Sequence, residues 1–146
     1  MAQDIFSILI AEDDKDDIYL LKSLLDEYFP HWYYQFITTG EAVLTYLARR
    51  NATYPFADIL LLDIHLPRLN GLQVLEKIRE TPTYDSLAVV GYSTIEDYQT
   101  MELFMKLGGN AYINKSNTQE GIKSMLDKLP GLIEWINQPL AKNKEY

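Results

Sequence analysis

Short apolar runs alternate with segments of helical period five times along the chain. The runs have strand length and occupy 6–11, 33–37, 59–62, 87–92 and 111–114. Helical spacing follows the first run at Ile18, Leu21 and Leu25, and Pro30 stops that helix. The run 59–62 contains no polar residue, which is typical of a strand covered on both faces. The alternation predicts five units of strand followed by helix.

Such an alternation implies an α/β fold with a parallel sheet, right-handed crossovers and helices on both faces. The expected strand order is 2-1-3-4-5. In open sheets of this kind, sites form beyond the carboxyl ends of the strands, where the strand order reverses. That point lies between the first and third strands.

Several residues mark the expected helix ends. Thr38 with Glu41 has the pattern of a capping box, although a simple turn around Gly40 is the alternative. Asn117 with Glu120 is expected to begin the last helix, which Pro130 should break, leaving one more short helical piece after it. Asn70 is the expected cap of the third helix, and Gly108-Gly109 the expected stop of the fourth, which carries Tyr98, Met101 and Met105.

The first and third apolar runs both end in acidic residues. Glu12 and Asp13 follow the first run, and Asp63 follows the third. If both runs are parallel strands, these three carboxylates crowd into one cleft at the switch point. Like charges this close are unfavourable unless a cation lies among them or a proton is shared. The pattern therefore predicts a hard divalent metal, with Asp63 as the carboxylate that does chemistry.

Composition narrows the class of protein. A length of 146 residues suits one domain, and the net charge of −8 argues against nucleic acid as a direct partner. The absence of cysteine excludes disulfides and thiolate zinc sites and fits a reducing cytoplasm. No targeting segment and no apolar stretch of about 18 residues is present, so no membrane partner is expected.

Five elements, in order and at matching spacing, resemble the response-regulator receiver domain of two-component signalling. They are Glu12-Asp13 in AEDDKDD, Asp63 in DILLLDIHLPRLNG, Ser93 in VVGYST, and Tyr112 and Lys115 in NAYINKS. The resemblance covers roughly residues 5–129 and implies the flavodoxin-like doubly wound (βα)5 fold. We expect a stand-alone receiver domain over 1–137 and a polar tail over 138–146. The chain also resembles the short receivers that serve sensor kinases of the phytochrome type.

The resemblance implies a phosphorylation site at Asp63. The phosphoryl group would come from a sensor histidine kinase or a histidine phosphotransfer protein, and its arrival would change affinity for a downstream protein. Mg²⁺ would be held by Glu12, Asp13, Asp63 and the backbone carbonyl of His65. The chain would act as a signalling phosphoacceptor and not as a turnover enzyme.

The remaining site residues have roles implied by the same resemblance. Lys115 would pair with the phosphoryl group, Ser93 would donate a hydrogen bond to it, and Tyr112 would swing between exposed and buried rotamers. Where the family usually has proline, Ser116 follows Lys115, so the peptide between them is either trans or a strained cis bond. Dimerisation by the family's common mode is in doubt, and a homodimer is left open.

Each element taken alone also has a plainer interpretation. The run EDDKDD could be a solvated, N-capping stretch at the first helix, and Thr94 could cap a helix starting near Ile95. Lys115 could be a surface lysine, and Tyr112 a core aromatic. Two other functions compete: a pseudo-receiver that binds partners without phosphorylation, and a phosphatase of the haloacid dehalogenase type. The phosphatase needs a second aspartate two residues after the nucleophile, where this chain has His65.

Overall fold

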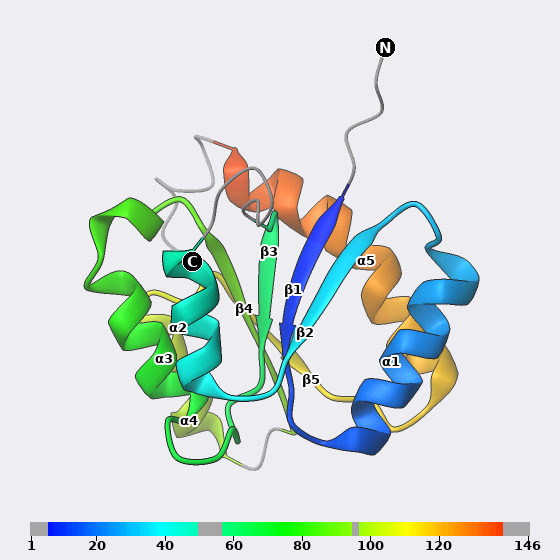
Figure 1. Ribbon diagram of the computed structural model, residues 1–146, viewed down its shortest axis with the longest axis horizontal. Coiled ribbons are helices and arrows are strands. Elements are labelled where there is room, and N and C mark those ends of the chain that lie inside the picture. The colour runs from blue at the N-terminus through cyan, green and yellow to red at the C-terminus, as the bar shows by residue number, and fades with distance from the viewer. Residues whose placement is uncertain (1–5, 50–56, 95–96, 139–146) are drawn as a thin grey trace.

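The structure is a five-stranded parallel sheet between two layers of helices (Figure 1). It is a computed structural model that describes residues 6–49, 57–94 and 97–138. The elements are, in order, β1 (Ser7–Ala11), α1 (Lys15–Tyr28), β2 (Tyr33–Ile37), α2 (Gly40–Ala48), β3 (Ile59–Leu62), α3 (Gly71–Arg79), the 3₁₀ turn η1 (Pro82–Tyr84), β4 (Ala88–Ser93), α4 (Tyr98–Lys106), β5 (Ala111–Asn114) and α5 (Gln119–Asn137). The strand order is β2-β1-β3-β4-β5, as predicted.

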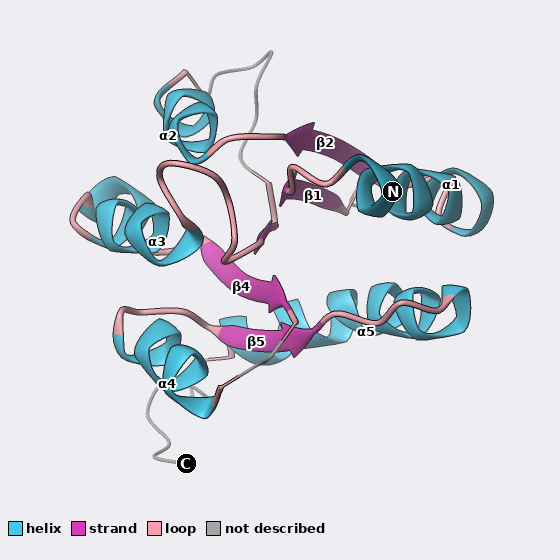
Figure 2. Ribbon diagram, turned by 90° about the horizontal axis from the view of Figure 1, so that it is seen from below, coloured by secondary structure: helices cyan, strands magenta, loops and turns pink. Residues whose placement is uncertain are grey.

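The two faces of the sheet build two separate cores. Ile8 and Ile10 of β1 face a core that α1 and α5 cover, whereas Leu9 and Ala11 face a core covered by α2, α3 and α4. This alternation follows from the two-residue period of a strand. Figure 2 shows the two helix layers on opposite sides of the strands. All four residues of β3 are fully buried, as expected for the central strand of a doubly wound sheet.

The register of the sheet brings the carboxyl ends of β1, β3 and β4 level with one another. Ala11 pairs with Leu62, and Leu62 pairs with Gly91. The ladder then continues past the strand ends: the Asp63 N–H donates to the Ala11 carbonyl at 3.0 Å, and the Lys115 N–H donates to the Ser93 carbonyl at 3.0 Å. Backbone pairing therefore fixes where these side chains leave the sheet.

Side-chain caps begin the helices, and two of them lie one residue later than expected. Asn70 caps α3, as predicted, and it forms a complete capping box with Gln73. Thr39, not Thr38, caps α2, because the Thr39 hydroxyl accepts the Ala42 N–H at 3.1 Å. Thr118, not Asn117, caps α5, because the Ser116 hydroxyl accepts the Thr118 N–H at 3.1 Å and delays the first turn.

The prediction that Pro130 breaks the last helix is wrong. α5 runs without interruption from Gln119 to Asn137 through Pro130. A proline in a helix interior costs about 3 kcal/mol. Beyond it, Ile133 and Ile136 are 9% and 7% exposed in the core under α1 and α5. Burying each isoleucine is worth roughly 1.5–3 kcal/mol, so packing offsets the proline.

α4 is anchored to the sheet by a single buried side chain, that of Phe104. Asp97 caps the helix, which begins at Tyr98; the alternative start near Ile95, capped by Thr94, is therefore wrong, although Ile95 itself lies outside the described residues. Gly109 lies so close to the Phe104 ring that an added Cβ would be 2.1 Å from it. Gly108 has a φ of +105°, which ends the helix as expected.

Arg79 ties the last turn of α3 to two neighbouring segments. Its guanidinium donates to the carbonyls of Gly108 (3.0 Å), Tyr84 (2.9 Å) and Leu87 (2.8 Å), and to Asn110 Oδ1 at 2.9 Å. Burial lowers the pKa of this side chain, yet its fixed fork of donors serves four separate acceptors at once. This clamp lies at the amino-terminal edge of β4, opposite the acidic residues.

The polar tail expected over 138–146 lies outside the described residues except for Gln138. Within the part of the chain that the structure describes, no helix combines the length and apolarity needed to cross a membrane.

Candidate functional site

Three carboxylates converge at the carboxyl edge of the sheet, between β1 and β3. One carboxylate oxygen from each of Glu12, Asp13 and Asp63 lies within 4.8 Å of the others. Glu12 is 0% and Asp63 3% exposed, whereas Asp13 is open to solvent. Asp13 and Asp63, 50 positions apart in the sequence, thus share one site, because they follow the adjacent strands β1 and β3. The expected clustering is present.

Lys115 reaches the same cluster from the end of β5. Its ammonium contacts Glu12 Oε1 at 2.5 Å, Asp17 Oδ2 at 2.9 Å and Asp63 Oδ2 at 3.2 Å. It also lies 5.3 Å from the centroid of the Tyr92 ring. The Lys115 side chain is only 15% exposed, so the interpretation as an ordinary surface lysine is wrong.

The buried acids differ in protonation. Burial, together with a hydrogen bond to Asp63, raises the pKa of Glu12 to about 9. Burial alone would raise the pKa of Asp63 too, but hydrogen bonds from Glu12 and the His65 N–H hold it below its ordinary value. Burial would lower the pKa of Lys115, yet its acidic neighbours raise it. In the cluster without a metal, these shifts favour a proton on Glu12 over a proton on Asp63, and Asp63 is the more readily ionised of the two.

Ser93 has a buried hydroxyl beside Tyr112. Its Oγ makes no hydrogen bond of normal geometry within the described ranges, 6–49, 57–94 and 97–138, although its interaction with the Tyr112 hydroxyl works against the rise in the pKa of that group. Buried hydroxyls are nearly always paired, so an unpaired one in a cleft points to a ligand atom. Ser93 ends β4 on the same sheet edge as Asp63, and β4 pairs with β3.

Tyr112 stands on β5, in the register that pairs it with Gly91. Its ring meets Phe104 edge to face, with centroids 5.5 Å apart. A Cβ at Gly91 would lie 2.7 Å from this ring, so the small residue leaves it room. Tyr112 is half-buried, and burial raises the pKa of its hydroxyl. The ring therefore lies between the core and the surface.

The loop after β3 holds the Asp63 carboxylate in place. The exposed His65 donates its backbone N–H to Asp63 Oδ1 at 2.9 Å. The expected metal contact of the His65 carbonyl stays a prediction. On the other side of the site, the peptide between Lys115 and Ser116 is trans, which answers the alternative left open by the missing proline.

Asp17 is a contact of Lys115 that the sequence interpretation missed. The acidic run begins a helix, as the plainer interpretation held, because Asp14 caps α1 and accepts the Asp17 N–H at 2.9 Å. Asp17 stands three residues after the capping Asp14, a position that the sequence shows but that by itself indicates no contact with Lys115.

The donor set fits a hard divalent cation. All three clustered side chains are carboxylates, which suit Mg²⁺ or Mn²⁺ and not a soft metal. Two of them are withdrawn from water, and the third opens the site to it. An ionised carboxylate beside a largely buried ammonium, with a buried hydroxyl at the end of the next strand, could together receive a tetrahedral anion.

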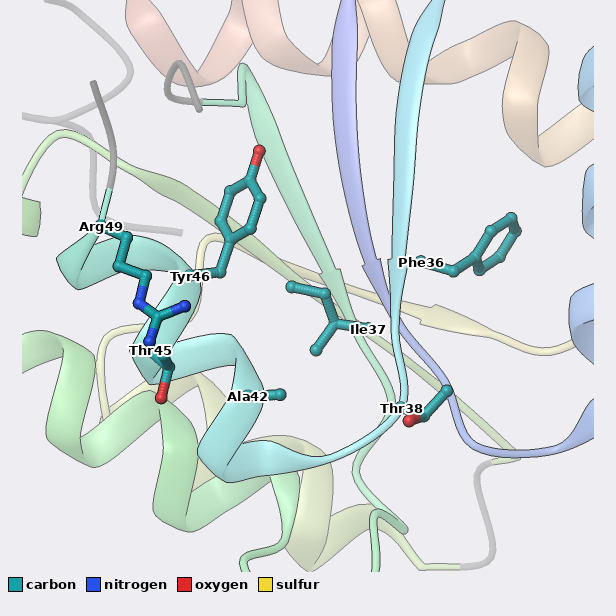
Figure 3. Close-up of a pocket in the computed structure, with 7 residues that line it drawn as sticks. All are labelled: Phe36, Ile37, Thr38, Ala42, Thr45, Tyr46 and Arg49. Carbon is teal, nitrogen blue, oxygen red and sulfur yellow. The ribbon is translucent and has the colours of Figure 1, made fainter. Parts of the chain in front are cut away.

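Two apolar hollows lie away from the acids. One, of about 430 Å³, lies between β2 and α2, and its lining residues are drawn in Figure 3. None of the acids contributes to it. The other, of about 460 Å³, lies over α4 and β5; it is lined by Tyr98, Met101, Glu102, Met105, Lys106 and Tyr112. Only this second hollow includes a residue of the predicted site.

Comparison with solved structures agrees with the fold. The phosphorylated cyanobacterial phytochrome response regulator RcpA superposes with a TM-score of 0.79 at 26% identity, covering 90% of this chain and 95% of RcpA. The response regulator RPA3017 in red light signalling of R. palustris gives a TM-score of 0.77 at 28% identity, covering 86% and 91%. The flavodoxin-like fold is thereby confirmed.

Sequence relatives point the same way. Response regulator Rcp1 of Synechocystis sp. is 25% identical over 137 residues, which cover 92% of this chain and 93% of Rcp1. The 3',5'-cyclic-nucleotide phosphodiesterase regA of Dictyostelium discoideum is 27% identical over 121 residues, but the chain spans only 15% of that protein. It likewise spans 37% of Stress response regulator protein 1 of Candida dubliniensis. The family model named "Response regulator receiver domain" matches residues 8–127, and the chain therefore belongs to the response regulator receiver family.

Proposed function

We propose that this receiver domain accepts a phosphoryl group on Asp63 and thereby changes its affinity for a downstream protein. The proposal is supported by three groups at one edge of the sheet: the ionised Asp63, the ammonium of Lys115 at 3.2 Å from it, and the buried Ser93 hydroxyl at the end of the neighbouring strand β4. RcpA, which is similar over 90% of the chain, was solved in its phosphorylated form.

The proposed reaction is an in-line transfer. An oxygen of Asp63 forms a bond to phosphorus, the bond from phosphorus to the donor's imidazole nitrogen breaks, and that imidazole retains the electron pair and takes a proton from water. Transfer of this kind depends on position and charge neutralisation. When bound by Glu12, Asp13 and Asp63, Mg²⁺ would neutralise the negative charge that gathers on the oxygens.

This chain's own residues support the transfer in distinct ways. The His65 N–H orients one Asp63 oxygen and leaves the other for attack. Lys115 supplies a positive charge beside that second oxygen. Ser93 donates its unused proton to a phosphoryl oxygen, which gives the buried hydroxyl the partner it lacks.

The proposed output is a change at the hollow over α4 and β5. Tyr112 lines that hollow with Tyr98, Met101 and Met105, and its ring also contacts the buried Phe104. If Ser93 turns toward the phosphoryl group, space beside Tyr112 changes and the ring moves inward. A shift of one aromatic ring at this place alters the surface that a partner protein meets.

The proposed phosphodonor is a sensor histidine kinase or a histidine phosphotransfer protein. RcpA is named as a phytochrome response regulator, and the R. palustris relative as a regulator in red light signalling. We therefore propose a sensor kinase of the phytochrome type as the first candidate to test.

Intact-mass spectrometry with acetyl phosphate and Mg²⁺ tests the acceptor. The wild-type chain should gain about 80 Da once, the increment of a single phosphoryl group. Asp63→Asn should gain nothing, whereas Asp16→Asn, which removes an exposed acid from the first turn of α1, should label like the wild type. Equal labelling of Asp63→Asn would move the acceptor elsewhere, and an unlabelled wild type would count against phosphorylation.

A further inference from the structure

Lys115 has used every hydrogen-bond donor it has. Its ammonium carries three N–H groups, and the structure gives it three carboxylate partners: Glu12, Asp17 and Asp63. An incoming ligand oxygen must therefore replace one of these acids. The position of Lys115 after ligand binding depends on which acid loses its ion pair with the ammonium and which acid retains it.

The metal and the lysine compete for the same oxygens. Glu12 and Asp63 contact the ammonium and also belong to the set of carboxylates that can hold a divalent cation. Two positive charges bound to the same pair of acids repel each other. When a cation occupies the cluster, Lys115 must loosen its contacts with both.

Asp17 is the acid that does not compete. It contacts Lys115 at 2.9 Å but does not belong to the cluster of Glu12, Asp13 and Asp63. We propose that Asp17 is a positioning residue that retains the Lys115 ammonium at the rim of the site when a divalent cation draws Glu12 and Asp63 away. This inference concerns the metal-loaded form of the proposed phosphorylation site, so it deepens that function.

The fold holds Asp17 where this role requires it. Its backbone N–H is bonded to the capping Asp14, so its place in the first turn of α1 does not depend on Lys115 or on a metal. The side chain is 40% exposed, whereas those of Glu12 and Asp63 are 0% and 4% exposed. Figure 1 shows the turn into α1 and the turn out of β5 at the same lower edge of the sheet.

A retained lysine has a consequence for phosphorylation. Lys115 stays beside Asp63 through metal binding and needs to exchange only one Asp17 oxygen for a phosphoryl oxygen. Without Asp17, the ammonium remains on Glu12 and Asp63 and opposes the cation there. Removing Asp17 should therefore weaken metal binding by way of Lys115.

Mn²⁺ binding to the full chain, measured by electron paramagnetic resonance without any phosphodonor, tests the proposal. Asp17→Asn should weaken Mn²⁺ binding roughly two- to fivefold, the range for a partly exposed ion pair. Asp16→Asn is the matched control, because it removes the same charge from the same turn at an exposed position with no lysine partner among the described residues. It should change binding by less than Asp17→Asn does.

A double-mutant cycle separates an effect through Lys115 from simple loss of charge. In a Lys115→Met background, which removes the competing ammonium, Asp17→Asn should change Mn²⁺ binding no more than Asp16→Asn does. An equal loss with and without Lys115 would overturn the proposal, as would a wild-type chain that binds no Mn²⁺. Circular dichroism confirms that each variant is folded. Because no phosphoryl transfer is measured, failure here is distinct from failure of phosphorylation at Asp63.

Discussion

Phe104 should contribute more to stability than any other residue of α4 among those described. It is 0% exposed, and it is the one described residue of α4 that is buried. A buried phenylalanine removes about 150–250 Å² from water, worth roughly 4–6 kcal/mol at about 25 cal/mol per Å² as an upper value. Truncations of this kind lose about 3–5 kcal/mol. The edge-to-face contact with Tyr112 contributes about 1 kcal/mol of that.

We therefore expect Phe104→Ala to lower the free energy of unfolding by about 4 kcal/mol. Urea denaturation followed by circular dichroism measures it, and the melting temperature should fall by about 8–16 °C. Leu103→Ala on the same helix is the control, since Leu103 is 45% exposed and should lose less than about 1 kcal/mol. If Phe104→Ala lowered the free energy of unfolding no more than Leu103→Ala does, the conclusion that Phe104 alone anchors α4 to the sheet would be refuted.

Three further predictions concern other parts of the molecule. Because the pKa of Glu12 is raised to about 9, its proton must leave when a metal binds, so Mg²⁺ affinity should rise with pH by up to about tenfold per unit between about pH 6 and 8. Competition against Mn²⁺ would measure this, and Glu12→Gln should flatten the slope. Arg79→Lys should cost about 2–3 kcal/mol in urea denaturation, since an ammonium cannot serve four separate acceptors; an unchanged midpoint would contradict the clamp. Pro130→Ala should raise the free energy of unfolding by up to about 3 kcal/mol by restoring a helical N–H, and a lower melting temperature would argue that the ring itself packs.

The sheet could be predicted from the sequence because its signals are strong and local. The run 59–62 is apolar throughout, and acidic residues stand directly after two of the strands. These two facts place Glu12, Asp13 and Asp63 together once the strands are parallel. The parallel pairing of β1 with β3 fixes where the side chains that follow these two strands leave the sheet.

What could not be predicted depended on competition between local and tertiary effects. Helix starts moved by one residue at Thr39 and Thr118, because neighbouring polar residues offer the backbone alternative bonds. Pro130 continued a helix because later residues pack into the core. The apolar residues by which the sequence marked α4 are not the ones that bury it. Tyr98 is 66% exposed, and Phe104 is the one buried residue described in this helix.

The Arg79 clamp has a consequence for motion. Two of its four bonds, to Gly108 and Asn110, hold the last turn of α3 to the turn that joins α4 to β5, at the sheet edge opposite Ser93. Gly108, which accepts one of these bonds, is the residue with left-handed backbone at the end of α4. A displacement that begins near Ser93 should therefore be largest at Tyr98 and vanish near Gly108. α4 would rotate about its fixed C-terminal end at Gly108. The surface it presents to other proteins would change in orientation more than in position.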